Sequence, residues 1–219
     1  MVKELVSTRV ESKRRRRPDG QISRDRILDA ATSVAAERGY DGTTIAAVSK
    51  ACGLPASSIY WHFTNKDDLI AAVIERSFVQ WLQVWQLPDA LSARDLLVEV
   101  AARTATAVKA SPDFLRLGLM LGLERRPMEP RARATFVRVR GEAFAALAGS
   151  FRQLIPELSD EQIAQLATYA IAGADGIFIA GEIGGDDVDL AALFDIHGRA
   201  LFDTAVRMVA ENRPDGRRG

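Results

Sequence analysis

The sequence predicts an all-α fold of about nine helices. Apolar side chains recur every three to four residues, as on one face of a helix, and few stretches alternate between apolar and polar. Ala and Leu, which favour helices, are abundant. Capping residues and helix-ending Gly or Pro divide the chain into segments without a fixed repeat period. We therefore expect packed helices, and neither a β-sheet nor a solenoid.

The first three predicted helices are short and separated by glycine turns. The first runs from about 22 to 38 and ends at Gly39. The second covers 44–52 and ends at Gly53. The third begins almost at once at Pro55, because the fixed φ of proline suits the first turn of a helix.

A long amphipathic helix is predicted next, over 67–86. Asn65 is a good N-cap for it, and its first turn holds Asp67 and Asp68, where negative charge meets the positive helix end. Pro88 stops it, and its length is enough to join two domains. The remaining helices are predicted at 92–110, 112–123, 130–155, 159–183 and 187–212.

The second and third helices have the arrangement of a helix-turn-helix, whose second helix enters the major groove of DNA. At 100° per residue, Ile59 and Phe63 of this helix point inward. Hydroxyl, phenol and indole groups, which can meet bases, sugars or phosphates, lie opposite and on the flanks, at Ser57, Ser58, Tyr60 and Trp61. His62 lies toward the edge, and Lys66 can add a phosphate contact.

These features also resemble a known family, the TetR family of bacterial transcriptional regulators. The likeness covers about 50 residues, from Arg24 to Ile74. It rests on Gly39-Tyr40-Asp41-Gly42-Thr43-Thr44, Cys52-Gly53-Leu54, Ile59-Tyr60-Trp61-His62-Phe63 and Asn65-Lys66-Asp67-Asp68-Leu69. The sequence departs from the family pattern at Pro55, where Ser or Thr is commoner, and at Ala56, which is often a polar or basic residue.

The resemblance implies a role for each matching residue. Phosphate contacts are expected from Thr44, Tyr60, His62 and Lys66, and the residues nearest the bases are expected to be Ser57, Ser58 and Trp61. Three parts of the chain follow: a flexible basic arm over 1–21, a DNA-binding domain over 22–66, and an effector-binding and dimerisation domain over 67–219. The last two helices, 159–183 and 187–212, are expected to pair across a two-fold axis.

The resemblance also implies an effector pocket among the helices of the larger domain. Large side chains there suit a hydrophobic ligand, and the candidate lining residues are Trp81, Trp85, Phe114, Met120, Phe144, Tyr169 and Asp175. Asp175, in an apolar stretch, needs a partner if buried. It can anchor a ligand amine, pair with an Arg across a dimer, or bind a helix end, and a structural role is favoured. His197 is expected at the surface or an interface.

Other classes of function find no support in the sequence. The single cysteine, Cys52, excludes a disulfide scaffold and fits a small core residue. No metal or cofactor site is expected, and no nucleophile elbow, phosphate loop or pair of catalytic carboxylates indicates an enzyme. No secretory signal or membrane span is expected, since the apolar stretch from Ile163 to Ile183 is interrupted by polar residues. A cytoplasmic protein is therefore predicted.

The charge distribution refines this interpretation. The chain carries 29 Lys and Arg and 29 Asp and Glu, a net charge of zero. Residues 1–78 hold 13 basic and 10 acidic side chains, and residues 79–219 hold 16 and 19. The basic run from Lys13 to Arg17 can follow a DNA backbone or can be a solvated tail, and both readings stay open.

The sequence thus predicts a homodimeric repressor that binds a palindromic DNA operator and is released by a small hydrophobic effector. The alternative is an all-helical carrier or enzyme without DNA binding.

Overall fold

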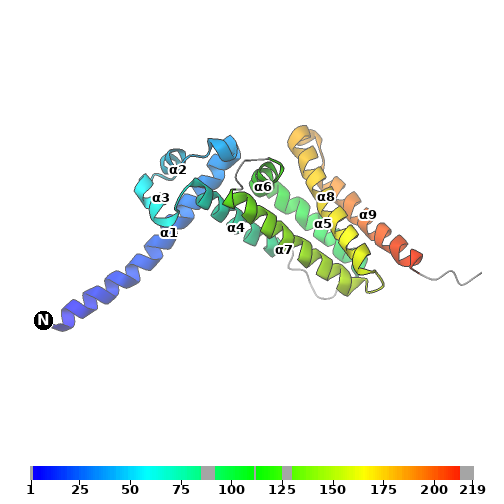
Figure 1. The fold of residues 1–219 in the computed structure, drawn as a ribbon, viewed down its shortest axis with the longest axis horizontal. Coiled ribbons are helices and arrows are strands. Elements are labelled where there is room, and N and C mark those ends of the chain that lie inside the picture. Colours follow the sequence, from blue (N-terminus) through cyan, green and yellow to red (C-terminus); the bar gives the residue numbers. More distant parts are fainter. Residues whose placement is uncertain (1, 85–91, 111, 125–129, 213–219) are drawn as a thin grey trace, which may run out of the picture. The chain divides into compact units, whose positions relative to one another are not determined.

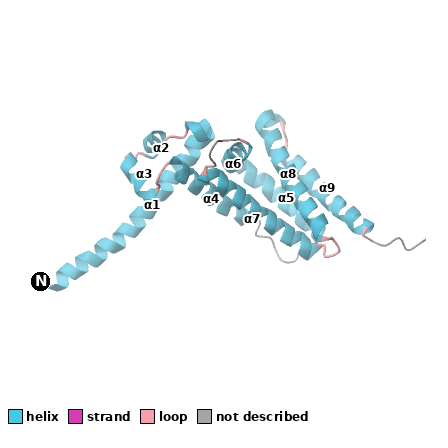
Figure 2. Cartoon of the chain, in the orientation of Figure 1, coloured by secondary structure: helices cyan, strands magenta, loops and turns pink. Residues whose placement is uncertain are grey.

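The computed structural model describes residues 2–84, 92–110, 112–124 and 130–212, and side chains within these from residue 20 onward, apart from 82–84 and 93. Over the described ranges, the regular structure is entirely helical (Figures 1 and 2), which confirms the predicted fold class. The helices are α1 (Val2–Gly42), α2 (Ile45–Cys52), α3 (Ala56–His62), α4 (Lys66–Val84), α5 (Ala93–Ala110), α6 (Asp113–Leu123), α7 (Arg131–Leu154), α8 (Asp160–Gly184), the 3-10 turn η1 (Gly185–Asp187) and α9 (Leu190–Glu211).

The largest departure from the sequence prediction is the start of α1. The helix begins at Val2 instead of near Ile22, so the segment expected as a flexible arm has helical backbone. Lys, Arg, Glu and Leu, which favour helices, make up much of that segment. The predicted end of the helix is confirmed, because the backbone turns at Gly39 with φ 67° and ψ −174°.

The chain forms two compact units. Unit 1 comprises Met1–Arg76 and Arg116–Phe136, and unit 2 comprises Ser77–Leu115 and Val137–Gly219. Helices α4, α6 and α7 therefore have residues in both units. The domain boundary expected after residue 66 falls inside unit 1, because the first turns of α4 belong to its core: Leu69 and Ile70 are completely buried.

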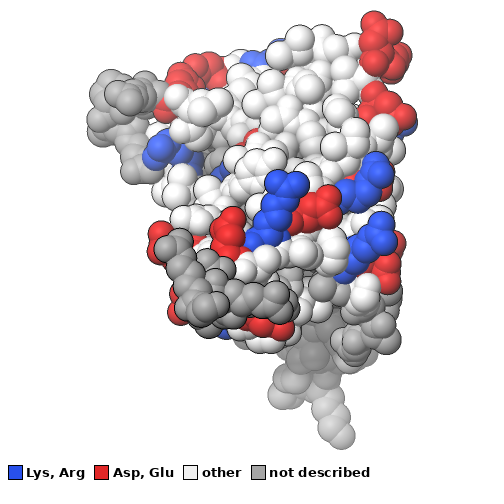
Figure 3. Space-filling model, turned by 90° about the vertical axis from the view of Figure 1, so that its right-hand side faces the viewer, with Lys and Arg blue, Asp and Glu red and all other residues white. Residues whose placement is uncertain are grey.

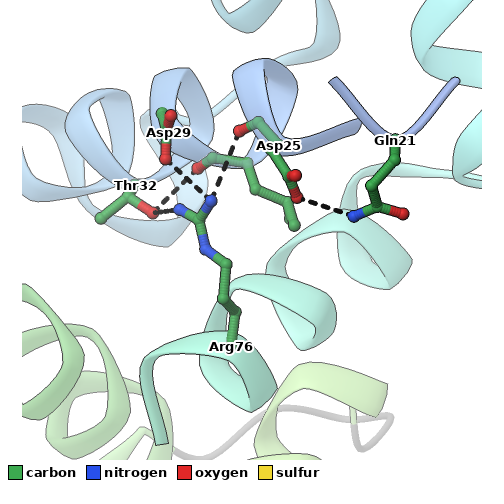
Figure 4. A network of polar contacts seen from close by, with 6 residues as sticks. Gln21, Asp25, Asp29, Thr32 and Arg76 are labelled. Carbon is green, nitrogen blue, oxygen red and sulfur yellow. Dashed lines mark hydrogen bonds and ion pairs between the residues drawn. The ribbon is translucent and has the colours of Figure 1, made fainter. Parts of the chain in front are cut away.

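The core of unit 1 combines α1 to α4. Its fully buried side chains include Ile27, Leu28, Val48, Ile59, Leu69 and Ile70. Polar contacts reinforce it, most clearly at Arg76 on α4 (Figure 4). The guanidinium of Arg76 donates to Asp29 Oδ1 at 2.8 Å, to the Asp25 carbonyl at 3.3 Å and to Thr32 Oγ1 at 3.3 Å. The arginine fork thus joins α4 to three consecutive turns of α1.

The core of unit 2 is built on α5, α7, α8 and α9. The cluster includes Leu97, Phe151, Leu158, Ile163, Leu166, Ala167, Ala170, Leu201 and Ala205. Small residues allow the helices to approach closely. A Cβ atom on Gly198 of α9 would lie 3.1 Å from the Leu97 carbonyl, and one on Gly173 of α8 would lie 2.2 Å from the His197 ring. His197 is therefore an internal packing residue of unit 2, where its Nε2 lies 2.9 Å from the Ala170 carbonyl.

One helix is long and apolar enough to cross a membrane, by length and composition only, although the sequence predicts no membrane span. Within Asp160–Asp187, a stretch of 18 residues has a mean hydropathy of 1.4, and 28% of this stretch is buried in the structure. Core helices of soluble proteins can be equally long and apolar. Here α8 places Leu166 and Ala167 in the core of unit 2, with no exposed surface. We therefore assign the hydropathy of α8 to helix packing.

Candidate nucleic-acid interface

The turn between α2 and α3 depends on Gly53. Its φ of 64° and ψ of 25° are left-handed, a conformation that glycine adopts without steric cost. A Cβ atom there would also lie 3.1 Å from the Arg26 guanidinium. The Ser49 hydroxyl donates to the Leu54 carbonyl at 2.6 Å and so ties α2 to the turn. The two helices are thus held in the helix-turn-helix arrangement that the sequence predicts.

Helix α3 exposes its aromatic side chains and buries its aliphatic anchor. Ile59 has no exposed surface and Phe63 has 3%, which confirms the predicted inward pair. Tyr60 is 57% exposed and Trp61 is 76% exposed. Ser57 is also exposed, whereas Ser58 is half-buried. Two exposed aromatic rings on a helix of 7 residues are typical of a contact surface.

The start of α3 shows the effect of the two departures from the family pattern. Pro55 is the N-cap and makes no side-chain hydrogen bond to the helix, which begins at Ala56. Its carbonyl still accepts a bond from the Ser58 amide at 2.9 Å. The helix therefore forms without the usual hydroxyl cap.

Thr44, another predicted phosphate contact, is the N-cap of α2. It is exposed, and its hydroxyl oxygen accepts from the Ala47 amide at 3.1 Å. A hydroxyl that accepts one hydrogen bond can still donate its own proton to a phosphate. The neighbouring Thr43 is instead buried, and its hydroxyl donates to the Gly39 carbonyl at 2.7 Å.

His62 lies between the exposed and buried sides of α3. Its ring packs edge-on against Trp61, with 4.7 Å between the ring centroids. Burial lowers the pKa of His62 below 6.5, and the charge of Arg24 lowers it further. The Arg24 guanidinium lies 5.4 Å from the centroid of the Phe63 ring. Sequence reasoning did not identify Arg24, because its proximity to α3 arises only from packing.

Lys66, a predicted phosphate contact, already has partners within unit 1. Its ammonium donates to the Tyr40 carbonyl at 3.0 Å and lies 4.2 Å from the centroid of the Tyr40 ring. It is also 4.0 Å from Asp41 Oδ1, and the side chain is 29% exposed. A phosphate contact from Lys66 would have to coexist with these interactions or displace them.

The residues predicted for an effector pocket are divided between the two units. Trp81 and Phe114 of unit 2 lie close, with ring centroids 6.3 Å apart. Phe144 packs against the core cluster of unit 2, and Tyr169 is 52% exposed beside His197. Met120 belongs to unit 1 and is 49% exposed. Trp85 lies outside the described residues.

Asp175 has a partner within the chain. Both of its carboxylate oxygens accept from the Arg140 guanidinium on α7, one of them at 3.1 Å and the other at a shorter distance. The side chains are 17% and 34% exposed, respectively. This paired, forked geometry is that of a structural ion pair. The partner lies on α7 of the same chain, which sequence reasoning could not identify.

Unit 2 also contains a hollow of about 830 Å³ between α5, η1 and the start of α9. Its lining includes the apolar side chains of Val108 and Phe178 and the charged side chains of Lys109, Glu182, Asp186, Asp187, Asp189 and Asp195. None of the predicted pocket residues that the structure describes lines it. Among the described residues, no group of three or more His, Cys, Asp or Glu side chains is placed to hold a metal ion.

The amino-terminal part of the chain matches a known protein family. Residues 27–73 match the model of "Bacterial regulatory proteins, tetR family". The chain is 36% identical over 55 residues to the negative transcriptional regulator IcaR of the icaADBC biofilm operon of Staphylococcus epidermidis. It is 34% identical over 64 residues to the transcriptional regulator AcrR of Shigella flexneri. These matches cover 25% and 29% of this chain, and only 30% of each relative.

Solved structures extend the likeness to the whole fold. The fatty acid degradation regulator FadR of Bacillus halodurans superposes with a TM-score of 0.67 at 19% identity, covering 81% of this chain and 93% of that one. FadR of Bacillus subtilis, solved in complex with stearoyl-CoA, gives 0.67 at 20% identity, covering 80% and 96%. All the relatives named here are called regulators and not enzymes. The amino-terminal part of the chain, residues 27–73, thus has the DNA-binding domain of the TetR family of bacterial regulatory proteins.

Proposed function

We propose that this protein is a DNA-binding transcriptional repressor that acts as a homodimer on a palindromic operator and is released by a small hydrophobic effector. The observation that carries the proposal is α3, which anchors itself through Ile59 and Phe63 and presents Tyr60 and Trp61 to solvent. Thr44, Ser57, Ser58, His62 and Lys66 are the further proposed DNA contacts. The names of its relatives, which are transcriptional regulators, support this function. The function in turn implies a location in the bacterial cytoplasm.

A selection experiment tests DNA binding without knowledge of the operator. The protein is incubated with a random-sequence duplex library, and bound duplexes are enriched over several rounds. We expect a palindromic sequence with half-sites about 34 to 36 Å apart or a multiple of this distance. Trp61→Ala should retain weak binding and lose the enrichment. A wild-type protein that enriches no sequence and shows no salt-sensitive binding would support the carrier or enzyme alternative instead.

The proposed dimer uses the outer faces of α8 and α9. Exposed small and apolar residues follow one stripe of α8, at Ala164, Thr168, Ala172, Gly176, Ile179 and Ile183. On α9, Ile196 is 55% exposed and Val206 is 52% exposed. The face drawn in Figure 3 carries a broad area without Lys, Arg, Asp or Glu, and side chains of both charges lie around this area. Because the opposite stripe of α8 lies in the core, this helix is apolar on both sides, as an interface helix should be.

Sedimentation measures the dimer directly. We expect a dimer at micromolar concentration, and a shift toward monomer when a charge is placed on the stripe by Ala172→Glu. The exposed Ala145 of α7 offers a matched control, because Ala145→Glu adds the same charge away from the stripe. A wild-type monomer would contradict the proposal.

The proposed effector site includes Trp81 and Phe114. Both belong to unit 2, Phe114 is buried, and a third ring, Phe78, lies 6.2 Å from Phe114. A protein of the same fold was solved with stearoyl-CoA, which makes this a suitable probe. Titrating stearoyl-CoA into a Trp61→Phe variant should change the remaining tryptophan fluorescence, and titrating it into the wild-type complex with the selected duplex should release the DNA. A probe that binds without releasing DNA would contradict an effector role.

A further inference from the structure

The first turn of α7 is held by a carboxylate that lies more than sixty residues earlier in the chain. Asp67 Oδ2 accepts from the Arg131 amide at 2.6 Å, and Asp67 Oδ1 accepts from the Ala132 amide at 3.2 Å. Ala132 has no exposed surface. Asp67 stands in the first turn of α4, directly after the helix-turn-helix. The two helix starts are therefore joined through one side chain within unit 1.

This contact has the chemistry of a helix N-cap. The first amides of a helix have no carbonyl partner within it, and a carboxylate both accepts their hydrogen bonds and meets the positive end of the helix dipole. Pro130, which directly precedes α7, has no side-chain acceptor. Asp67 thus performs for α7 the task that a local Ser or Asp performs in most helices.

The same carboxylate reaches the end of α1. The Tyr40 hydroxyl donates to Asp67 Oδ1 at 2.8 Å, and Tyr40 is 8% exposed. The Tyr40 carbonyl in turn accepts from Lys66 at 3.0 Å and from the Thr43 amide at 3.3 Å, in the turn that leads into α2. One side chain therefore links α7 to the residues that place the helix-turn-helix.

Helix α7 continues from unit 1 into unit 2. Its residues 131–136 belong to unit 1, and in unit 2 its Arg140 pairs with Asp175 of α8. A single helix thus makes a polar contact to the DNA-binding elements at its start and to a helix of the proposed dimer interface one turn into unit 2.

We propose that Asp67 is a positioning residue for DNA binding, because its carboxylate fixes the first turn of α7 to the helix-turn-helix and so restricts where the two α3 helices of a dimer can lie. The proposal rests on the proposed repressor function. Binding a palindrome requires both α3 helices in register at once, whereas non-specific binding does not. Loosening this link should therefore weaken binding to the selected duplex more than binding to an unrelated one.

Asp67→Asn tests this with Arg131→Ala as the matched control. Asparagine has one acceptor oxygen, and its NH₂ group would face an amide that also donates, so at least one of the two capping hydrogen bonds is lost. Arg131→Ala removes the ion pair between Arg131 and Asp68 but leaves the capped backbone amide in place. The readout is the ratio of affinities for the selected duplex and for an unselected duplex of equal length, at fixed salt. Partial unfolding lowers both affinities alike and leaves the ratio unchanged.

We expect the ratio to fall about fivefold in Asp67→Asn, the factor that corresponds to the free energy of one typical capping hydrogen bond, and to stay within twofold of wild type in Arg131→Ala. An unchanged ratio in Asp67→Asn, or an equal fall in both variants, would overturn the positioning role while leaving the repressor function intact. A wild-type protein with a ratio of one would overturn both.

Hydrogen exchange on the wild type removes any dependence on a folded variant. Binding of the selected duplex should slow hydrogen exchange at the Arg131 and Ala132 amides. DNA restrains the helix-turn-helix, and the Asp67 carboxylate passes this restraint to the first turn of α7, so its amides open less often. Unchanged exchange at these two amides on DNA binding would overturn the proposal.

Discussion

The helices within unit 1 and the helices within unit 2 are held together by different kinds of contact. In unit 1, side chains with fixed hydrogen-bond geometry join the helices: Arg76 binds three turns of α1, and Asp67 binds Tyr40 and the start of α7. In unit 2, the helices pack mainly through aliphatic and small residues. Directional contacts fix the placement of a helix, whereas apolar packing tolerates exchange of one side chain for another. Under the proposed function, unit 1 needs the first property to bind DNA, and unit 2 can use the second to bind an effector.

The largest expected effect tests the apolar core of unit 2. Phe151 of α7 is 1% exposed within the main cluster, and Phe151→Ala should lower the free energy of unfolding by about 3–5 kcal/mol. Urea denaturation followed by circular dichroism measures it. Phe202 of α9 packs on the same cluster but is only half-buried, so Phe202→Ala should cost clearly less. Equal losses would show that burial does not set the stability of this unit.

The next effect separates function from stability in unit 1. Trp61→Ala should weaken binding to the selected duplex by about 1–3 kcal/mol, because an exposed contact to DNA is removed. The free energy of unfolding should change by less than about 0.5 kcal/mol, since the ring is 76% exposed. Val79→Ala, at another exposed apolar residue, is the control and should change neither quantity. A large loss of stability in Trp61→Ala would assign the ring to the core of unit 1.

A smaller effect asks whether unit 2 also contains a directional contact. A double-mutant cycle on Arg140 and Asp175 should give a coupling energy of about 0.5–1.5 kcal/mol, discounted because Arg140 is 34% exposed. The pair of Arg152 and Asp160 has side chains 58% and 86% exposed, and its cycle should give about 0–0.5 kcal/mol. Equal coupling energies in the two cycles would mean that the forked geometry of Arg140 and Asp175 adds nothing.

The smallest effect is a pH dependence at His62. The pKa of folded His62 lies below 6.5, through burial and the charge of Arg24, so the unfolded chain takes up a proton first as the pH falls. The stability that the neutral ring contributes is therefore present above about pH 6.5 and is lost as the pH falls toward the folded pKa. His62→Gln should remove this component of the pH dependence of unfolding.

DNA should oppose the shift at His62. A phosphate beside the ring favours the charged form, so the pKa should rise when the selected duplex binds, and affinity should increase as the pH is lowered. NMR titration of the ring with and without DNA measures both pKa values, and His197→Gln identifies the signal, since the chain has only 2 histidines. An unchanged pKa on binding would remove His62 from the proposed DNA contacts.

The sequence prediction was also more accurate for the helix-turn-helix of unit 1 than for the effector residues. The helix-turn-helix, its glycine turn and the burial of Ile59 and Phe63 were predicted correctly, because caps, turns and helical periodicity depend on residues close in sequence. The effector residues were predicted from the family resemblance and from residue type. They are dispersed in the structure: Met120 lies in unit 1, Phe144 packs in the core, and Asp175 pairs with Arg140.

The sequence by itself determined most of the helices, the motif of α2 and α3, and the likeness of the amino-terminal domain to the TetR family. It placed the start of the first helix near residue 22, whereas α1 begins at Val2. Only the tertiary structure decided which distant groups meet: Lys66 with Tyr40, Arg24 with Phe63, and Asp67 with the start of α7. Pairings between residues 26 to 64 positions apart leave no periodic signal in a single chain, because only the packing of the helices brings these residues together.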